Sequence, residues 1–588
     1  MTWYISNRGD DGNDGTSPGT AWRSFARLEQ VKLAAGDAIL LDAASVWNEP
    51  LRLTGRGTPE APIVLSSYGQ EIRRLPGWDA GFRLEQRPLI VWGDGAAVEL
   101  SDVSHWIVRG LAIECSTEST LYPELRRVDD PTTIDQPSRH PTDGVNYGIL
   151  VRTAAGSPQR GICIQANYVR GRGPNQNSEG ILVSAETTES ATEPTLRDIA
   201  IRNNLVELVG WRGIGTGGRS IKPGATGIPW IPLKNLVMEG NAARDIGLQG
   251  ICAFNAHEVV MRRNLVDGAG QYRGVGAKWG PAGLWPWSCA HVLIEFNEVT
   301  NMFDGNTGAD ATGIDIDWNS HHVTVRRNHV YGNMGSGIVT MSCHSSSIES
   351  NRIEGNLAKV NMGPGQIGLS DYQTAKGEHG ITGVRDLSVE DNLIILDRDA
   401  TTALSTVRIS EGAWERIGFH RNRIVFFDHA RRQYAYDIQP TTNIEGIGSN
   451  RFYGIDAESF TARIDDRTVD WTTWQTDGYD ADAWFAPLDG TSPSVVDDLV
   501  ATRTDEGVLL TWRESEDSLS GVHHYNVYRG SHRAFEPRYL TLIGQPATPE
   551  FRDPAPVGDG ECWYQVEAED ACGNRSGQYA VIRVETRP

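Results

Sequence analysis

One short pattern recurs along most of this 588-residue chain: an alternating apolar strand that leads into an asparagine, as in IRNNLV, IEFNEV and VRRNHV. The recurring residues are Asn167, Asn204, Asn241, Asn264, Asn297, Asn328, Asn351, Asn392, Asn422 and Asn450. Neighbouring members lie 23 to 41 residues apart, as expected for coils of one minimum length with loops of varied length inserted. A repeat of this period is typical of a solenoid.

The apolar residues inside each repeat alternate, which indicates short strands. Short strands at a coil-length repeat, without intervening helices, predict an all-β right-handed parallel β-helix. We expect each asparagine to lie at a bend, to adopt the left-handed backbone conformation, and to bond to the asparagines of neighbouring coils. The segment SFARLEQVKLAAGD (24–37) has an amphipathic helical pattern, and we expect it to cap the first coil.

Several segments carry a family resemblance. WYISNRGDDGNDGTSPGTAWRSF, AGDAILLDAASVWNEPLRL and GTPEAPIVLSSYG near the start, and TWQTDGYDADAWFAPL near residue 485, resemble right-handed parallel β-helix carbohydrate-active enzymes. Those families include polysaccharide lyases and several glycoside hydrolases. The resemblance implies that residues 1–485 are a catalytic β-helix domain with an N-terminal cap, and it leaves the reaction open because the families share a scaffold but differ in chemistry.

The pattern changes after a Pro/Ser/Gly-rich linker, residues 486–493. Residues 494–588 alternate apolar and polar positions in strands separated by turns, and they resemble a fibronectin type III domain. The aromatic residues at its expected core positions are Trp512, Tyr525, Tyr528 and Tyr564. The resemblance implies a small β-sandwich that acts as a spacer or attachment module.

The charge composition argues against some classes of binding partner. With 54 basic and 76 acidic residues the net charge is −22, which argues against general binding to nucleic acid or to an anionic membrane. No run approaches the ~20 apolar residues of a membrane span. The start of the chain lacks a basic and apolar leader, and we expect an extracellular or periplasmic protein whose leader has been removed, with a cytoplasmic protein as the alternative. The sequence does not indicate an oligomeric state.

The seven cysteines show no CxxC spacing, so the sequence gives little support to a zinc or redox site. Their scatter predicts small buried apolar residues, with a disulfide between Cys562 and Cys572 as a minor alternative.

A candidate site emerges when the glycine-led strands GILVS, GIGTG, GICAF, GLWPW, GIDID and GIVTM are aligned. The residue after each glycine then points inward, and the alternate residues point outward. Adjacent coils are ~4.8 Å apart and alternate residues on one strand ~6.6–7 Å apart. The alignment therefore predicts an exposed wall on which Trp285 and Trp287 lie one coil from Asp315 and Asp317.

Two carboxylates this close repel each other, so one holds its proton while the other ionises. Glycoside hydrolysis needs that division between an acid and a base or nucleophile. Asp315 and Asp317 are the predicted pair, and Asp310 is a third catalytic candidate because its loop leads into the same strand. The indoles offer flat apolar faces to sugars. The further substrate-binding candidates, from glycine-rich insertions, are Lys278, Trp279, Asp371 and His379.

Two other functions use the same wall. A lyase would bind Ca²⁺ through the aspartates and take the proton of a uronate with Lys278 or Arg326, whereas the hydrolase needs no metal. A non-catalytic β-helix would bind a glycan without cleaving it. The simplest interpretation is that these side chains form an ordinary solvent-exposed surface. His321, His322 and His344 lie nearby in sequence, where we expect corner or hydrogen-bonding roles.

Overall fold

The computed structural model describes most of the chain. The described residues are 1–69, 87–116, 145–153, 158–185, 193–218, 233–272, 280–305, 307–357, 365–371, 383–396, 404–410, 412–427, 433–439, 444–554 and 561–585.

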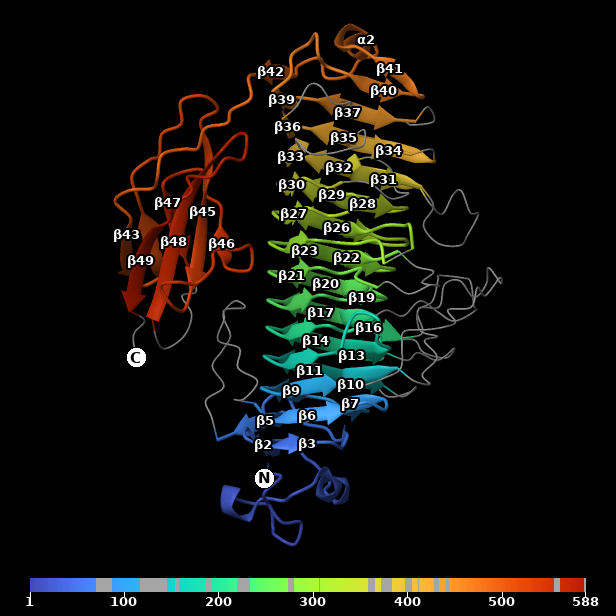
Figure 1. Ribbon diagram of the computed structural model, residues 1–588, viewed down its shortest axis with the longest axis vertical. Coiled ribbons are helices and arrows are strands. Elements are labelled where there is room, and N and C mark those ends of the chain that lie inside the picture. Colours follow the sequence, from blue (N-terminus) through green and yellow to red (C-terminus); the bar gives the residue numbers. More distant parts are fainter. Residues whose placement is uncertain are drawn as a thin grey trace.

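The predicted right-handed parallel β-helix is confirmed. Three long sheets run the length of the solenoid, and each has 14 strands within the described residues (Figure 1). Each coil in the body of the solenoid contributes one strand to each sheet, so neighbours in a sheet are three strands apart in the chain except at the two ends.

Sheet A faces one side of the solenoid. Its strands are β1 (Thr2–Ile5), β2 (Ala38–Asp42), β5 (Ile63–Tyr68), β8 (Trp106–Arg109), β11 (Gln159–Gln165), β14 (Leu196–Arg202), β17 (Leu233–Glu239), β20 (Ala256–Arg262), β23 (Ala290–Glu295), β26 (His321–Arg326), β29 (His344–Glu349), β32 (Val384–Glu390), β35 (Trp414–His420) and β38 (Ile444–Gly448).

Sheet B is built from shorter strands. They are β3 (Val46–Trp47), β6 (Leu89–Trp92), β9 (Ala112–Cys115), β12 (Tyr168–Arg170), β15 (Leu205–Glu207), β18 (Ala242–Arg244), β21 (Leu265–Asp267), β24 (Glu298–Thr300), β27 (His329–Tyr331), β30 (Arg352–Glu354), β33 (Leu393–Leu396), β36 (Arg423–Phe426), β39 (Arg451–Tyr453) and β42 (Trp484–Ala486).

Sheet C is built from 14 strands that include the glycine-led ones. They are β4 (Leu51–Leu53), β7 (Ala96–Ser101), β10 (Asn146–Thr153), β13 (Ser178–Ala185), β16 (Arg212–Gly218), β19 (Gln249–Phe254), β22 (Ala282–Trp287), β25 (Thr312–Ile316), β28 (Ile338–Met341), β31 (Gly365–Ser370), β34 (Leu404–Ile409), β37 (Gln433–Ile438), β40 (Ala462–Ile464) and β41 (Arg467–Val469).

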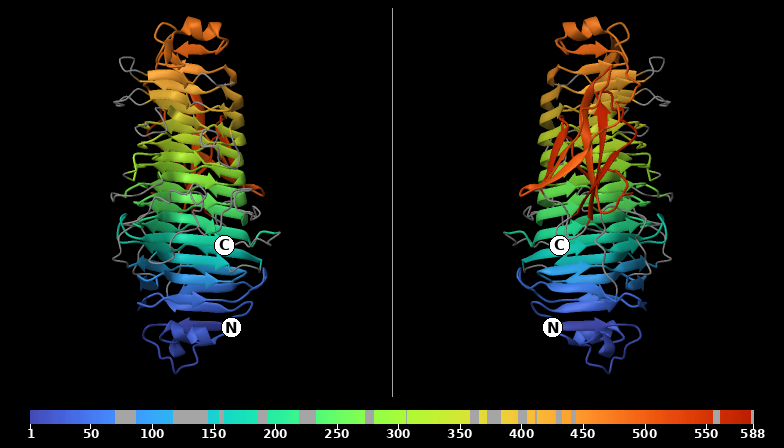
Figure 2. Two further views of the ribbon diagram at one scale, coloured as in Figure 1. Left: turned by 90° about the vertical axis from the view of Figure 1, so that its right-hand side faces the viewer. Right: turned by 90° about the vertical axis from the view of Figure 1, so that its left-hand side faces the viewer.

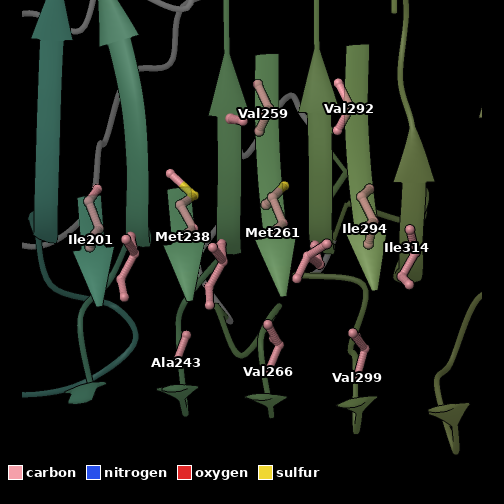
Figure 3. Packing of buried hydrophobic residues seen from close by; sticks show 14 of the residues in the cluster. Ile201, Met238, Ala243, Val259, Met261, Val266, Val292, Ile294, Val299 and Ile314 are labelled. Atoms are coloured by element: carbon pink, nitrogen blue, oxygen red, sulfur yellow. The ribbon is translucent and has the colours of Figure 1, made fainter. Parts of the chain in front are cut away.

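Inward-pointing apolar side chains stack in columns between the three sheets. Figure 3 shows one part of this core, where Met238 and Met261 of sheet A face Ala243 and Val266 of sheet B. All four are fully buried. The alternation in the sequence sets this arrangement, because successive residues of a strand point to opposite faces.

The recurring asparagines form the predicted ladder. Each of the ten is buried, and each of the first nine donates from Nδ2 to Oδ1 of the next at 2.9–3.1 Å. The ladder ends where Asn450 Nδ2 donates to Asp480 Oδ1 at 2.9 Å.

The prediction for the backbone of these asparagines was wrong by one position. The residue with positive φ is the one before each asparagine, for example Asn203 (52°), Arg263 (51°) and Phe296 (55°). The bend made by that residue turns the following asparagine inward, where its amide meets the next coil. A shorter second ladder, not predicted from the sequence, runs from Asn333 to Asn356 and Gln366.

The N-terminal cap differs from the prediction. A 3₁₀ helix, η2 (Phe25–Gln30), replaces the expected longer helix, and its Phe25 and Leu28 are buried over the first coil. The helix ends at Gln30 with Val31 as its C-cap, and the Asp37 carboxylate accepts the Ala34 N–H at 2.9 Å in the turn before β2.

The remaining helices are short. η1 (Pro18–Thr20) is a further 3₁₀ turn, and α2 (Trp471–Thr476) closes the other end of the solenoid. The Asp470 side chain caps α2 by accepting the Thr473 N–H at 2.8 Å. Across the described parts of the chain, no helix is long and apolar enough to cross a membrane.

A small antiparallel β-domain follows the solenoid. One sheet contains β43 (Val500–Thr504), β44 (Gly507–Thr511) and β47 (Glu550–Asp553), and the other contains β46 (Leu542–Gly544), β45 (Val522–Gly530), β48 (Glu561–Asp570) and β49 (Ala580–Glu585). Trp512, Tyr525 and Tyr564 pack in its core as expected. Its membership of the fibronectin type III family stays a prediction.

Tyr528 does not belong to that core. It packs with Phe535, Tyr539 and Leu542 against Phe296 of the solenoid, so it contributes to the contact between the domains. The sequence could not separate these roles because both sites are buried and apolar. All seven cysteines are free, so the Cys562–Cys572 disulfide is wrong, and six of the seven are buried.

The small domain lies alongside the solenoid against sheet B (Figures 1 and 2). Arg352 of β30 pairs with Glu569 of β48 at 3.0 Å, and Arg423 of β36 donates to the Ala571 carbonyl at 2.9 Å. These partly or fully buried charges fix the position of the domain along the solenoid.

The asparagine ladder can be tested at Asn297, in the middle of the stack. Its Nδ2 bonds to Met261 O and to Asn328 Oδ1, both at 2.9 Å. Asn297→Ala leaves buried partners unsatisfied, and we expect the free energy of unfolding to fall by about 2–4 kcal/mol. Asn48→Ala, at an exposed position, should change it by less than about 0.5 kcal/mol. Urea denaturation followed by circular dichroism measures both, and equal effects would show that the ladder adds no stability.

Candidate functional site

The candidate wall is formed by β19, β22 and β25 of sheet C. Cys252 pairs with Trp285 and Phe254 with Trp287, and Leu284 pairs with Ile314 in the next coil. The register therefore matches the alignment made from the sequence. It places Asp315 one coil from Trp285, and Asp317 one residue beyond the end of β25.

The wall is less exposed than predicted. Asp315 is 3% exposed and Trp287 8%, while Trp285 and Asp317 are half-buried. The prediction of four exposed side chains is therefore wrong for Asp315 and Trp287. Aromatic packing accounts for the burial of Trp287, since the ring centroids of Trp287 and Trp318 are 5.4 Å apart.

Phe254 extends the aromatic surface into the preceding coil. Its ring meets Trp285 edge-on at 4.6 Å, and the guanidinium carbon of Arg212 lies 4.7 Å from the ring centroid. Arg212 in turn lies 3.9 Å from Glu179, and both are nearly fully buried. Burial raises the pKa of Glu179 while the Arg212 charge lowers it.

Arg212 and Trp318 were missed by the sequence analysis. Arg212 is the first residue of β16 and directly precedes the glycine in WRGIGTG, at the position equivalent to Glu179 in the preceding coil. Opposite charges at equivalent positions of adjacent repeats were the available signal.

Asp310 reaches the wall from the loop between β24 and β25. Asp310 and Ala311 both have positive φ, at 56° and 55°. A Cβ added at Gly280 would lie 2.0 Å from Asp310 Oδ2, so only glycine leaves room for this carboxyl group. Consecutive non-glycine residues in this conformation carry strain of the kind found at functional sites.

Burial and mutual repulsion perturb all three carboxyl groups. Burial raises the pKa of Asp310 to about 6. It raises the pKa of Asp317 to about 7, with repulsion from Asp310 added and the Trp318 N–H, 2.6 Å from Oδ1, acting in the opposite direction. The pKa of Asp315 is raised well above its usual value by burial and by both neighbouring carboxylates. These shifts oppose ionisation of all three carboxyl groups at once, an arrangement that can place a proton donor beside a proton acceptor.

The other predicted residues divide into two groups. Lys278, Trp279 and His379 lie outside the described residues. Asp371 is described and 2% exposed. Its carboxylate accepts bonds from Ser342 Oγ at 3.1 Å and from the Gly383 and Ala413 amides at 2.8 Å, so it ties neighbouring loops together and gains no support as a substrate ligand.

Arg326, the described candidate for the base of a lyase, lies on sheet A. Its Nε and Nη2 both donate to Glu295 Oε2, at 3.0 and 2.9 Å. The structure therefore places it on a different face from the aspartates, and the prediction that it acts beside them is wrong.

Comparison with known proteins agrees with the fold. The family model described as right handed beta helix region matches residues 220–392. The lacto-N-biosidase of Bifidobacterium longum subsp. longum is 24% identical in an alignment 436 residues long, which covers 62% of this chain and 26% of that protein. This chain thus spans about a quarter of the length of that relative. The alpha-1,3-galactosidase A of Akkermansia muciniphila is 36% identical over 76 residues, 13% of this chain and 11% of that protein.

A solved structure, a GH136 lacto-N-biosidase from Eubacterium ramulus, aligns with a TM-score of 0.49 and 18% identity. The alignment covers 77% of this chain and 67% of that one.

The raised pKa of Asp317 predicts a measurable pH dependence of stability. The folded chain holds this proton more tightly than the unfolded chain, so ionisation opposes folding as the pH rises from about 4 through about 7. Asp317→Asn removes that cost. We expect it to raise the free energy of unfolding at pH 8 by on the order of 1–3 kcal/mol, with little gain at pH 4.

Thermal and urea unfolding at the two pH values measure this effect. Asp94→Asn, at an exposed position, is the control. An equal change at pH 4 and pH 8 would show that ionisation of Asp317 does not oppose folding.

Proposed function

We propose that this chain is a carbohydrate-active enzyme that hydrolyses glycosidic bonds on the wall formed by β19, β22 and β25. The observation that carries the proposal is the group of Asp310, Asp315 and Asp317, whose pKa values are all raised and which lies beside a half-buried indole. Glycoside hydrolysis needs one protonated and one ionised carboxyl group around a sugar.

Asp310 and Asp317 are the pair that we propose to meet the substrate. Both side chains are half-buried and retain solvent contact, whereas Asp315 is 3% exposed. We assign Asp317, whose pKa burial and the Asp310 carboxylate raise to about 7, as the acid that protonates the leaving oxygen. Asp310 is the carboxylate that acts as nucleophile or activates water.

Asp315 has a supporting role in this proposal. Its side chain is buried, and its Oδ1 has no hydrogen-bond partner among the described residues. Burial and both neighbouring carboxylates raise its pKa well above the usual value, which favours the uncharged form and limits the charge on the wall. A neutral neighbour allows Asp310 to ionise while Asp317 keeps its proton.

Trp285 is the proposed surface for the sugar. It is half-buried and is braced edge-on by Phe254, so one part of the indole stays available for stacking. An aromatic face is complementary to the C–H-rich side of a pyranose. Trp287 is packed against Trp318 and supports the wall from within.

The names of the relatives support hydrolysis, since lacto-N-biosidase and alpha-1,3-galactosidase describe glycosidases. A periplasmic or extracellular location suits such a function. The lyase alternative is weakened by Arg326, which is bonded to Glu295 on another sheet.

Activity on a glycan panel tests the proposal. We expect new reducing ends that form equally well with a chelator present, and no unsaturated product absorbing in the ultraviolet. Asp317→Asn should lower kcat by about 10²–10⁴, and Asp310→Asn by at least as much, because each removes a proton-transfer or bond-forming group. Asp94→Asn should retain full activity.

Two other outcomes of the glycan panel would contradict hydrolysis. A chelator-sensitive unsaturated product would replace hydrolysis with lyase chemistry. Glycan binding without turnover in the parent chain would make the wall a binding surface only.

The indole can be tested separately. Trp285→Ala should raise KM by about 10-fold while changing kcat less, because stacking of about 1 kcal/mol or more positions the sugar without moving a proton. Trp285→Phe should recover part of the affinity. If both variants match the parent in KM and kcat, the sugar does not stack on Trp285.

A further inference from the structure

Histidines gather on the outer surface of sheet A, away from the carboxylate wall. His257 of β20, His291 of β23, His321 and His322 of β26, and His344 of β29 occupy two adjacent positions at the start of successive strands. His321 pairs in register with His344, and His257 pairs with Ala290, which precedes His291. The stacking of coils therefore converts scattered sequence positions into one cluster.

Three of these histidines converge. One ring nitrogen of each of His321, His322 and His344 can be chosen so that all three lie within 4.8 Å of one another. The Nδ1 atoms of His321 and His322 are 2.8 Å apart, and the rings of His321 and His344 are stacked with centroids 4.8 Å apart and planes at 7°. Two nitrogens bound to one Zn²⁺ can be at most about 4.2 Å apart, so small side-chain rotations bring the three onto one ion.

The backbone around the cluster holds the rings in place. His291 and His322 both have positive φ, at 55° and 53°, and their rings lie 4.6 Å apart. This left-handed bend sends two consecutive side chains, His321 and His322, to the same outer surface, where an ordinary strand would separate them. Without that bend, His322 could not join His321 and His344.

The ligand atoms that the three residues offer are imidazole nitrogens. Asp386 of β32, on the same sheet, is already engaged in an ion pair with Arg416 at 2.5 Å. The cluster is therefore a nitrogen site.

We propose that His321, His322 and His344 form a binding site for a late first-row divalent cation of the Zn²⁺ class. Imidazole nitrogen is a preferred ligand of such ions, whereas Ca²⁺ and Mg²⁺ prefer oxygen. The half-buried and exposed positions of the three residues leave the remaining coordination positions to water. We assign this histidine cluster no role in the proposed hydrolysis.

The ion would crosslink two neighbouring coils. His321 and His322 belong to the coil that carries Asp315 and Asp317, and His344 belongs to the next coil. Binding to the folded state alone stabilises it in proportion to the logarithm of the ion concentration. The site therefore reinforces the solenoid at the coil that also carries the carboxylate wall.

Zn²⁺ titration of the full chain, purified without a polyhistidine tag, tests the proposal. We expect one Zn²⁺ per chain by calorimetry, a visible absorption band with Co²⁺ that Zn²⁺ abolishes, and a Zn²⁺-dependent rise in the unfolding midpoint that EDTA reverses. Ca²⁺ should not displace Co²⁺. His322→Ala should weaken binding by at least about tenfold, a loss that even outer-shell changes at metal sites can cause.

Two further variants complete the test. His344→Gln keeps the size of the side chain and should give the same loss, while circular dichroism confirms that it folds. His532→Ala removes an exposed histidine of the small domain and should leave the stoichiometry and affinity unchanged. Failure of the parent chain to bind Zn²⁺, or undiminished affinity in both His322→Ala and His344→Gln, would overturn the proposal.

Discussion

The structure depends on the stacking of one coil on the next. Parallel backbone hydrogen bonds set the spacing at ~4.8 Å, and the buried asparagine ladder repeats at that spacing from Asn167 to Asp480. Each amide is satisfied by the coils on either side, so the polar column costs no unpaired group inside the core. The preceding left-handed residue turns each asparagine inward, so the bend and the ladder recur together along the solenoid.

Regular stacking converts sequence repeats into columns of like position. Columns that face inward are apolar and build the core, while columns that face outward can hold polar or reactive side chains. On sheet C, two such columns bring Trp285 beside Asp315 and Asp317. On sheet A, two others bring His321 and His322 beside His344. One coil, from β25 to β26, thus contributes to both candidate sites.

The small domain packs against the third face of the solenoid, which is formed by sheet B. Its described ion pairs and backbone contacts with the solenoid involve sheet B and the adjacent bends, through Glu298, Arg352 and Arg423. Sheet B has the shortest strands, and the domain covers part of it (Figure 2). The carboxylate wall on sheet C and the histidine cluster on sheet A belong to the other two faces. The packing of the domain is therefore compatible with access to both.

The sequence by itself determined the repeat, the strand register and the asparagine ladder, because coil-length periodicity and alternation are local properties of the chain. It also placed Asp315 correctly beside Trp285. The sequence also placed Asp310 near this strand, but only the tertiary structure decided that Asp315 is buried and that Gly280 leaves the space for the Asp310 carboxyl group, since exposure and loop paths depend on packing between coils. The convergence of His322 with His344 likewise required a left-handed bend, whose effect on side-chain direction appears only when the coils are stacked.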